Sequence, residues 1–216
     1  TAAPLSRSLN FDGTNDYVTV PHAASLSTGS VATFEAFVKP TATPNSRRGI
    51  MGKTTWQVNV LAPASGTGVR FEFRTRTTAT GTFRTITTGT FALNQWYHVA
   101  ATYDGTTMRL FVNGVQQGTG LAATGAINST TALLMGSLTT GGGRFPGRID
   151  EGRVSNIVRY AANFTPPTTA FTADANTRAL WHFNEGAGTS AADSSGNASA
   201  GTLVNGPTWN ADVPVP

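Results

Sequence analysis

The chain has 216 residues, a formal net charge of +4, 24 glycines and only 12% charged side chains. A chain of this length buries enough surface to fold without disulfides. Because it has no cysteine, it cannot build zinc–thiolate sites, iron–sulfur clusters or thiol nucleophiles. Its 36 threonines and its aromatic residues favour pleated strands, and glycine supplies turns. The composition argues against a helical bundle and against a mostly parallel α/β enzyme.

The basic residues are 13 arginines and two lysines, scattered along the chain. No RNP-type aromatic motif, zinc finger or basic helix accompanies them, so we expect no nucleic-acid partner. No apolar run reaches the ~18 residues of a membrane span. The chain opens at Thr1 without methionine and ends on Val-Pro-Val-Pro. We therefore expect a secreted or surface-exposed, monomeric module of a longer protein, with one domain over residues 1–210 and a Pro-rich linker beginning at 211–216.

Short strand-like runs recur along the chain, separated by Gly, Asn, Asp and Pro. The expected strands are 17–20, 33–39, 56–61, 69–76, 95–103, 108–112, 115–117, 133–135, 147–154 and 179–184. Asn113-Gly114 is the strongest signal for a two-residue hairpin. No amphipathic helix of three turns is expected, and 154–162 has room for one short helical turn. A sheet that buries one face needs a second sheet across it, so the pattern predicts one all-β domain of two stacked antiparallel sheets.

Five motifs follow one another in order and cover about residues 9–209. They are "LNFDGTNDYVTVP" (9–21), "FEAFVKP" (34–40), "QWYHVAATYDGTTMRLFVNG" (95–114), "GRIDEGRVSN" (147–156) and "WHFNEGAGTSAADSSGNASAGTLVNGPTW" (181–209). Together they resemble the bacterial laminin-G-like or pentraxin-like domains of the concanavalin A-like lectin/glucanase superfamily. The resemblance implies a jelly-roll sandwich of two curved antiparallel sheets, one concave and one convex.

The loop Asp12-Gly-Thr-Asn15-Asp16 concentrates hard oxygen ligands, which suit calcium. The alternative is an Asx-turn that leads into the strand at 17–20. The resemblance favours the metal, because many relatives hold a structural Ca2+ where the two chain ends meet, and it brings Asp150 to the site. Without a metal, Asp150 would pair with a nearby arginine. The acid-and-amide loop 193–197 either completes the same site or forms a turn.

Catalysis is not expected. A glycosidase needs two facing carboxylates, whereas Asp150 and Glu151 are neighbours that a regular strand would send to opposite faces. By the same rule, Tyr97 and His98 cannot share the groove that a polysaccharide lyase requires, and His98 is expected to be a packed strand residue. No Gly-x-Ser-x-Gly elbow is present.

The remaining functional candidate is a polar sheet face. Strand 69–76 places Val69, Phe71, Phe73 and Thr75 on one side and Arg70, Glu72, Arg74 and Arg76 on the other. The candidate ligand-binding residues are Gln57, Asn59, Arg70, Arg74, Arg76, Arg84 and, in a glycine-rich loop, Phe145. Arginine forks bind carboxylate or sulfate bidentately, which points to an acidic polysaccharide. The alternatives are a solvated outer face and, for Phe145, a mobile hairpin tip.

These observations predict a non-catalytic, carbohydrate-binding or surface-partner-binding module with a structural Ca2+. Its partner would be a polysaccharide or glycan, or a protein surface. The alternatives are a structural spacer or adhesin domain with no sugar ligand, and a polysaccharide-cleaving enzyme of the same fold.

Overall fold

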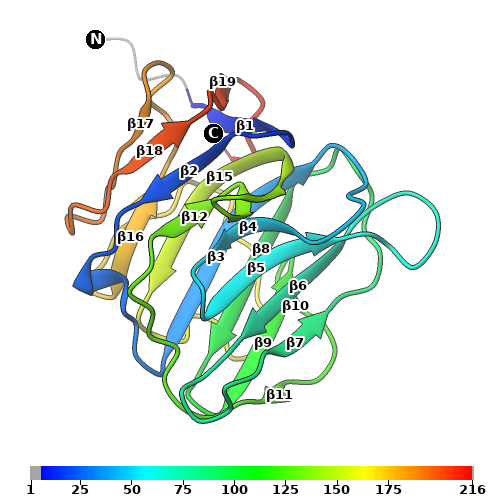
Figure 1. The fold of residues 1–216 in the computed structure, drawn as a ribbon, viewed down its shortest axis with the longest axis vertical. Helices are drawn as coiled ribbons and strands as arrows, with labels where there is room; N and C mark the ends of the chain where they lie inside the picture. The colour runs from blue at the N-terminus through cyan, green and yellow to red at the C-terminus, as the bar shows by residue number, and fades with distance from the viewer. Residues whose placement is uncertain (1–5, 216) are drawn as a thin grey trace.

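The computed structural model describes residues 6–215, which form two large antiparallel sheets packed face to face (Figure 1). The nine-stranded sheet has the order β10-β9-β8-β3-β15-β1-β19, with β11 beside β9 and β16 beside β15. Its strands are β1 (Ser8–Asp12), β3 (Ala32–Pro40), β8 (Tyr97–Tyr103), β9 (Thr107–Val112), β10 (Val115–Gln116), β11 (Leu121–Ala122), β15 (Pro146–Ser155), β16 (Thr177–Trp181) and β19 (Thr208–Asn210).

The eight-stranded sheet faces the viewer in Figure 1 and has the order β17-β18-β2-β12-β4-β5-β6-β7. Its strands are β2 (Tyr17–Val20), β4 (Arg48–Gly52), β5 (Trp56–Leu61), β6 (Arg70–Thr75), β7 (Arg84–Thr87), β12 (Leu133–Met135), β17 (Ser190–Ala191) and β18 (Gly201–Val204). A separate hairpin consists of β13 (Ser137–Thr139) and β14 (Gly142–Arg144).

The predicted all-β sandwich is confirmed, and the strands expected at 17–20, 56–61 and 133–135 match the observed ones to the residue. Across residues 6–215 the only helical segment is the short 3₁₀ turn η1 (Ala24–Leu26), so the helical turn considered for 154–162 does not form. No helix in the described part of the chain is long and apolar enough to cross a membrane.

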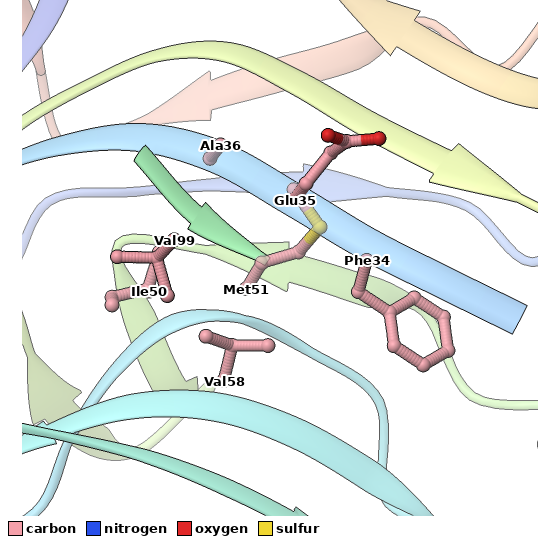
Figure 2. A pocket seen from close by; sticks show the side chains of 7 residues that line it. All are labelled: Phe34, Glu35, Ala36, Ile50, Met51, Val58 and Val99. Carbon is pink, nitrogen blue, oxygen red and sulfur yellow. The ribbon is translucent and has the colours of Figure 1, made fainter. Parts of the chain in front are cut away.

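The hydrophobic core lies between the two sheets, where alternate residues of each strand point inward. Phe34 of β3 stacks on Trp56 of β5 with ring centroids 3.6 Å apart, and Phe73 of β6 packs beside them. Figure 2 shows the apolar space around Phe34 and Val58, with Glu35 pointing to the opposite side of β3. This space has no volume for a water molecule, so it belongs to the packed core and is not a binding site.

The outer face of the nine-stranded sheet is covered by chain segments. Phe171 and Val215 pack there against Phe37 and Leu180 in a second, smaller apolar cluster. Asp212 accepts hydrogen bonds from Lys39 Nζ at 2.7 Å and from Trp96 Nε1 at 2.9 Å. The packed structure therefore extends beyond residue 210 to Val215. The nine-stranded sheet is therefore packed on both of its faces.

Candidate functional site

The outer face of the eight-stranded sheet carries the polar residues that alternate with the core residues of β5 and β6. Gln57 lies opposite Arg74 in the register of the two strands, and Asn59 lies opposite Glu72. Phe71 and Phe73, the neighbours of Glu72 and Arg74 in β6, are fully buried between the sheets. The predicted sorting of β6 into an apolar and a polar face is therefore confirmed, and the polar face is turned away from the core.

Three buried polar atoms on this face have no hydrogen-bond partner. They are Oε1 of Gln57, Oδ1 of Asn59 and Nε of Arg74, on side chains that are cross-strand neighbours. Asn59 does donate from Nδ2 to Glu72 Oε1 at 2.9 Å, so only its oxygen is left over. Buried polar groups are normally paired, and each unpaired one carries a desolvation cost of roughly 1–3 kcal/mol. On this face, two amide oxygens and one guanidinium N–H therefore have no hydrogen-bond partner within the protein.

A pocket of about 270 Å³ lies on the same face, and of the three residues with unpaired atoms Gln57 lines it. Its floor is Gly52, Gln57 and Leu134, from β4, β5 and β12. Its walls are residues 53–54 and 131–132 on one side and residues 138–140 of the β13–β14 hairpin on the other. The volume is just below the roughly 300–1,000 Å³ that is typical of small-molecule pockets.

The hairpin can form this wall because residue 49 in β4 is a glycine. A Cβ atom on Gly49 would lie 2.2 Å from the carbonyl oxygen of Ser137, at the start of β13. The hairpin is also held internally, since Arg144 donates to Ser137 Oγ at 2.6 Å and to the carbonyl of Thr140 at 2.7 Å. The wall is therefore a fixed part of the fold, built on direct backbone contact with β4.

Lys53, in the turn between β4 and β5, is one of the residues that line the pocket. Only 3% of this residue is exposed. Its Nζ lies 3.0 Å from Nδ1 of His22, and burial lowers its pKa to about 8. Hydroxyl groups surround this part of the pocket, since Thr54 Oγ1 and Thr131 Oγ1 lie 3.0 Å and 2.8 Å from Ser129 Oγ.

Positive charge predominates on the neighbouring part of the face. Glu72 is held by Arg47, which donates from Nε at 2.5 Å and from Nη2 at 2.8 Å. Arg74 has no acid partner of its own in the described chain, and its guanidinium lies 3.5 Å from the ring centroid of Phe83. Arg47 and Arg74 thus both lie near a single carboxylate, that of Glu72.

A family model described as the concanavalin A-like lectin/glucanases superfamily matches residues 12–164 of the chain. The chain belongs to this superfamily. The predicted resemblance to laminin-G-like domains is thereby confirmed. Among curated protein sequences, none matches this chain.

Three solved structures are similar to this chain. The mouse laminin alpha1 chain, domains LG4-5, has a TM-score of 0.54 at 12% identity over 76% of this chain and 45% of that one. Domain 4 of AbnA, a GH43 extracellular arabinanase from Geobacillus stearothermophilus solved with arabinotriose, has a TM-score of 0.48 at 17% identity. The match covers 68% of this chain and 69% of that one. Tailspike protein 2 of the Escherichia coli O157:H7 bacteriophage CAB120 has a TM-score of 0.47 at 13% identity. The match covers 73% of this chain and 27% of that one. This superfamily member thus spans less than half of the laminin and tailspike chains.

Of the seven predicted ligand-binding residues, Gln57 lines the pocket of this concanavalin A-like domain. Asn59 and Arg74 are its neighbours on the same face of β5 and β6, and the other four lie elsewhere. Arg70 is on the outer face at the far end of β6, where its Nε donates to the carbonyl of Ala62 at 2.9 Å. Arg76 follows β6 and is exposed, 5.4 Å from the ring of Phe83. Arg84 is two residues before the buried Ile86 of β7, so it lies on the core side of the sheet at its open edge. Its assignment to the polar face was wrong.

Phe145, the fourth of these residues, is fully buried and is no exposed sugar platform. Its N–H donates to the carbonyl of Gly136 at 2.9 Å, at the base of the hairpin. The ring packs over Gly147, where a Cβ would come within 2.8 Å of it. The glycine-rich loop does form a hairpin tip, as the alternative proposed, but the aromatic residue after it enters the core.

The four residues predicted to bind calcium do not form one site. Asp12 lies opposite Pro146 in the β1–β15 register, four residues and therefore about 13 Å along the strand from Asp150. Within the loop, Asp16 accepts from the N–H of Asp12 at 3.0 Å, and Asp12 accepts from the N–H of Thr14 at 2.6 Å, which is an Asx-turn. No group of three or more acids or histidines suited to a metal occurs in residues 6–215. Asn15 contributes its carbonyl oxygen to Asn205.

Two other acids, Asp193 and Glu151, accept hydrogen bonds from backbone N–H groups of the fold. Asp193 accepts from the N–H groups of Leu180 and Ser195, so loop 193–197 forms a turn. Glu151 has a φ of 51° in a β-bulge and accepts from the N–H of Phe171, which places it on the outer side together with Asp150. The expectation that these two acids point to opposite faces was therefore wrong, because the bulge interrupts the alternation.

His98 is buried as expected, with 1% of the residue exposed. Its Nε2 is 3.1 Å from Glu35 Oε2, and Arg153 and Tyr160 complete a buried polar cluster with this carboxylate. The residues that the sequence reasoning missed are Lys53, Thr131 and the hairpin wall. The available signals were the rarity of lysine in an arginine-rich chain and the closely spaced Gly49 and Gly52.

Proposed function

We propose that this domain is a carbohydrate-binding module and that it holds its glycan in the pocket on the outer face of the eight-stranded sheet. The glycan is bound there without cleavage. The module acts outside the cell, as part of a larger secreted or cell-surface protein. The superfamily, which comprises lectins and glucanases, supports the ligand class.

The observation that carries this proposal is the group of unpaired polar atoms beside the pocket. A sugar hydroxyl both donates and accepts, so it can pair with Oε1 of Gln57, which lines the pocket, and with Nε of Arg74, which lies opposite Gln57 in β6. Gln57 and Arg74 are only half-buried, and their side chains can turn these atoms toward a ligand. The threonine hydroxyls of the pocket wall add further partners.

The charges of the face support binding over catalysis. Glycoside cleavage uses two carboxylates on either side of the bond. Among the residues that the structure describes, β5 and β6 present one carboxylate on this face, Glu72, and it is held by Arg47 and Asn59. The carboxylate of Glu72 thus accepts its hydrogen bonds from Arg47 and Asn59 of the same face.

The test is a glycan array followed by calorimetric titration of the best ligand. Gln57→Ala and Arg74→Ala should each weaken binding at least tenfold, because Gln57 lines the pocket and Arg74 lies opposite it in β6. Arg84→Ala is the matched control, since it removes the same charge from the opposite side of the sheet. An equal loss in all three variants, or binding that is unchanged in the first two, would place the ligand elsewhere. A folded protein that binds no glycan would refute the proposal.

A further inference from the structure

We infer that the pocket selects acidic sugars, and that the ammonium group of Lys53 binds the carboxylate of a uronic acid unit. This inference rests on the proposed glycan-binding function and names its ligand class. Its starting point is Lys53, a buried lysine that forms no ion pair with any carboxylate of residues 6–215.

Lys53 is almost completely buried, yet no carboxylate of residues 6–215 forms an ion pair with it. The titratable group that faces its Nζ is the imidazole of His22, at 3.0 Å. The walls on the other sides carry the hydroxyls of Thr54 and Thr131 and the hairpin residues 138–140. A lysine side chain normally extends its charged end into water, whereas this one is almost completely buried and belongs to a residue that lines a pocket.

The other buried cations of the domain are satisfied by the fold itself. Arg153, which is 7% exposed, has Glu35 at 2.8 Å, and Arg144 donates to a hydroxyl and to backbone carbonyls. The second lysine of the chain, Lys39, has Asp212 at 2.7 Å. Lys53 therefore stands out as the buried lysine that has no anionic partner among residues 6–215.

The pocket beside Lys53 fits one kind of anion. Gln57 and the threonines offer hydrogen bonds to hydroxyl groups, and Leu134 and Leu138 offer an apolar surface to a sugar ring. A carboxylate on that ring would meet the ammonium in a partly dehydrated site, where the attraction is stronger than in water. A neutral sugar in the same position gains no such attraction, so the pocket should distinguish a uronic acid from its uncharged counterpart.

The experiment compares oligouronates with their methyl esters, which have the same shape and no charge. Oligogalacturonate, oligoglucuronate and oligomannuronate, each with its ester, are titrated into the unaltered protein at pH 7. We expect at least one acid to bind, and to bind at least tenfold more tightly than its ester. If the array finds only neutral glycans, or if ester and acid bind equally, the inference is overturned while the proposed function stands. If no glycan binds at all, both fall.

Variants of Lys53 then test whether this residue causes the preference for the acid over the ester. K53M keeps the stem and removes the charge, so it should abolish the difference between acid and ester, whereas K53R should retain part of it. K39M is the matched control, because it removes the other lysine from the opposite sheet, and it should leave the preference unchanged. A preference that survives in K53M would assign the carboxylate to the neighbouring arginines and refute the role of Lys53.

Discussion

Arg153 donates from Nε to the buried carboxylate of Glu35, 2.9 Å away, across the pair of strands β3 and β15. His98 and Tyr160 bind the other oxygen of the same carboxylate, at 3.1 Å and 2.9 Å. Burial alone would raise the pKa of Glu35, but these partners hold the pKa below its usual value. Because Tyr160 belongs to the segment that covers the nine-stranded sheet, the cluster fastens this cover to the sheet.

Replacing Glu35 with glutamine should therefore destabilise the domain strongly. The change leaves Arg153 buried without its counter-charge, which typically costs about 3–5 kcal/mol. Since the folded pKa of Glu35 is lowered, its stabilising contribution is present above the unfolded pKa and is lost as the pH falls through the folded value. Urea denaturation at pH 7 and pH 4 should show a large loss at pH 7 that shrinks at pH 4. A loss of equal size at both pH values would mean that packing, not charge, accounts for it.

Lys53 should behave in the opposite way, because its charge is buried without a partner. Lys53→Met keeps the apolar stem, so we expect it to increase the free energy of unfolding by about 1–2 kcal/mol at pH 7. The folded pKa of about 8 is below that of the unfolded chain, so the wild-type protein should gain stability as the pH rises from about 8 to 10. Chemical denaturation of both proteins at pH 7 and pH 10 checks this, and the variant should lack the gain. If Lys53→Met is destabilising, the ammonium serves the fold and not a ligand.

Asp150 is a buried carboxyl group whose titration should give the stability of the domain a clear pH dependence. Burial, and next the negative charge of Glu151, raise its pKa to about 9. The folded protein therefore keeps a proton that the unfolded chain releases near pH 4, and stability should fall as the pH rises between about 4 and 9. Asp150→Asn, which still accepts from the N–H of Glu151, should remove this fall and stabilise the domain by about 2 kcal/mol or more at pH 8.

The control for this prediction is Asp104, whose shift has the opposite sign. Burial works against it, but hydrogen bonds from Arg109 and Thr106 hold the pKa of Asp104 far below its usual value. Asp104→Asn should therefore destabilise the domain at pH 8. Denaturation curves for both variants at pH 5 and pH 8 test the pair. If Asp150→Asn destabilises the protein at pH 8, the carboxylate has a partner, such as a cation, that favours its charged form.

The sequence predicted the sorting of side chains between core and surface well, because β5 and β6 are regular strands in which alternation is undisturbed. Trp56, Phe71 and Phe73 point inward, and Gln57 and Arg74 point outward, as the pattern indicates. The alternation failed at Asp150 and Glu151, where a bulge adds a residue. It was also misapplied at Arg84, since the neighbouring Ile86 already marks that side of β7 as the core side.

The pocket could not be predicted, because it arises from contacts between segments far apart in the sequence. The hairpin at 137–144 reaches β4, some ninety residues earlier in the chain, through a backbone contact that leaves no periodic signal. The burial of Lys53 likewise depends on residues 22 and 131 meeting at one turn. Local pattern assigns a side chain to a face of its own strand, whereas the covering of that face is decided by tertiary structure.

Gly49 links the hairpin to the pocket and allows the wall to be tested without altering any polar residue. Gly49→Ala would place a Cβ atom 2.2 Å from the carbonyl oxygen of Ser137, so the hairpin has to move outward. We expect a loss of about 1–3 kcal/mol in the free energy of unfolding, typical of overpacking, together with weaker glycan binding. Gly89→Ala is the matched control, because nothing lies within 4 Å of the added atom. Thermal denaturation and glycan titration of both variants decide the matter: binding that survives in Gly49→Ala would show that the hairpin is not a wall of the glycan site.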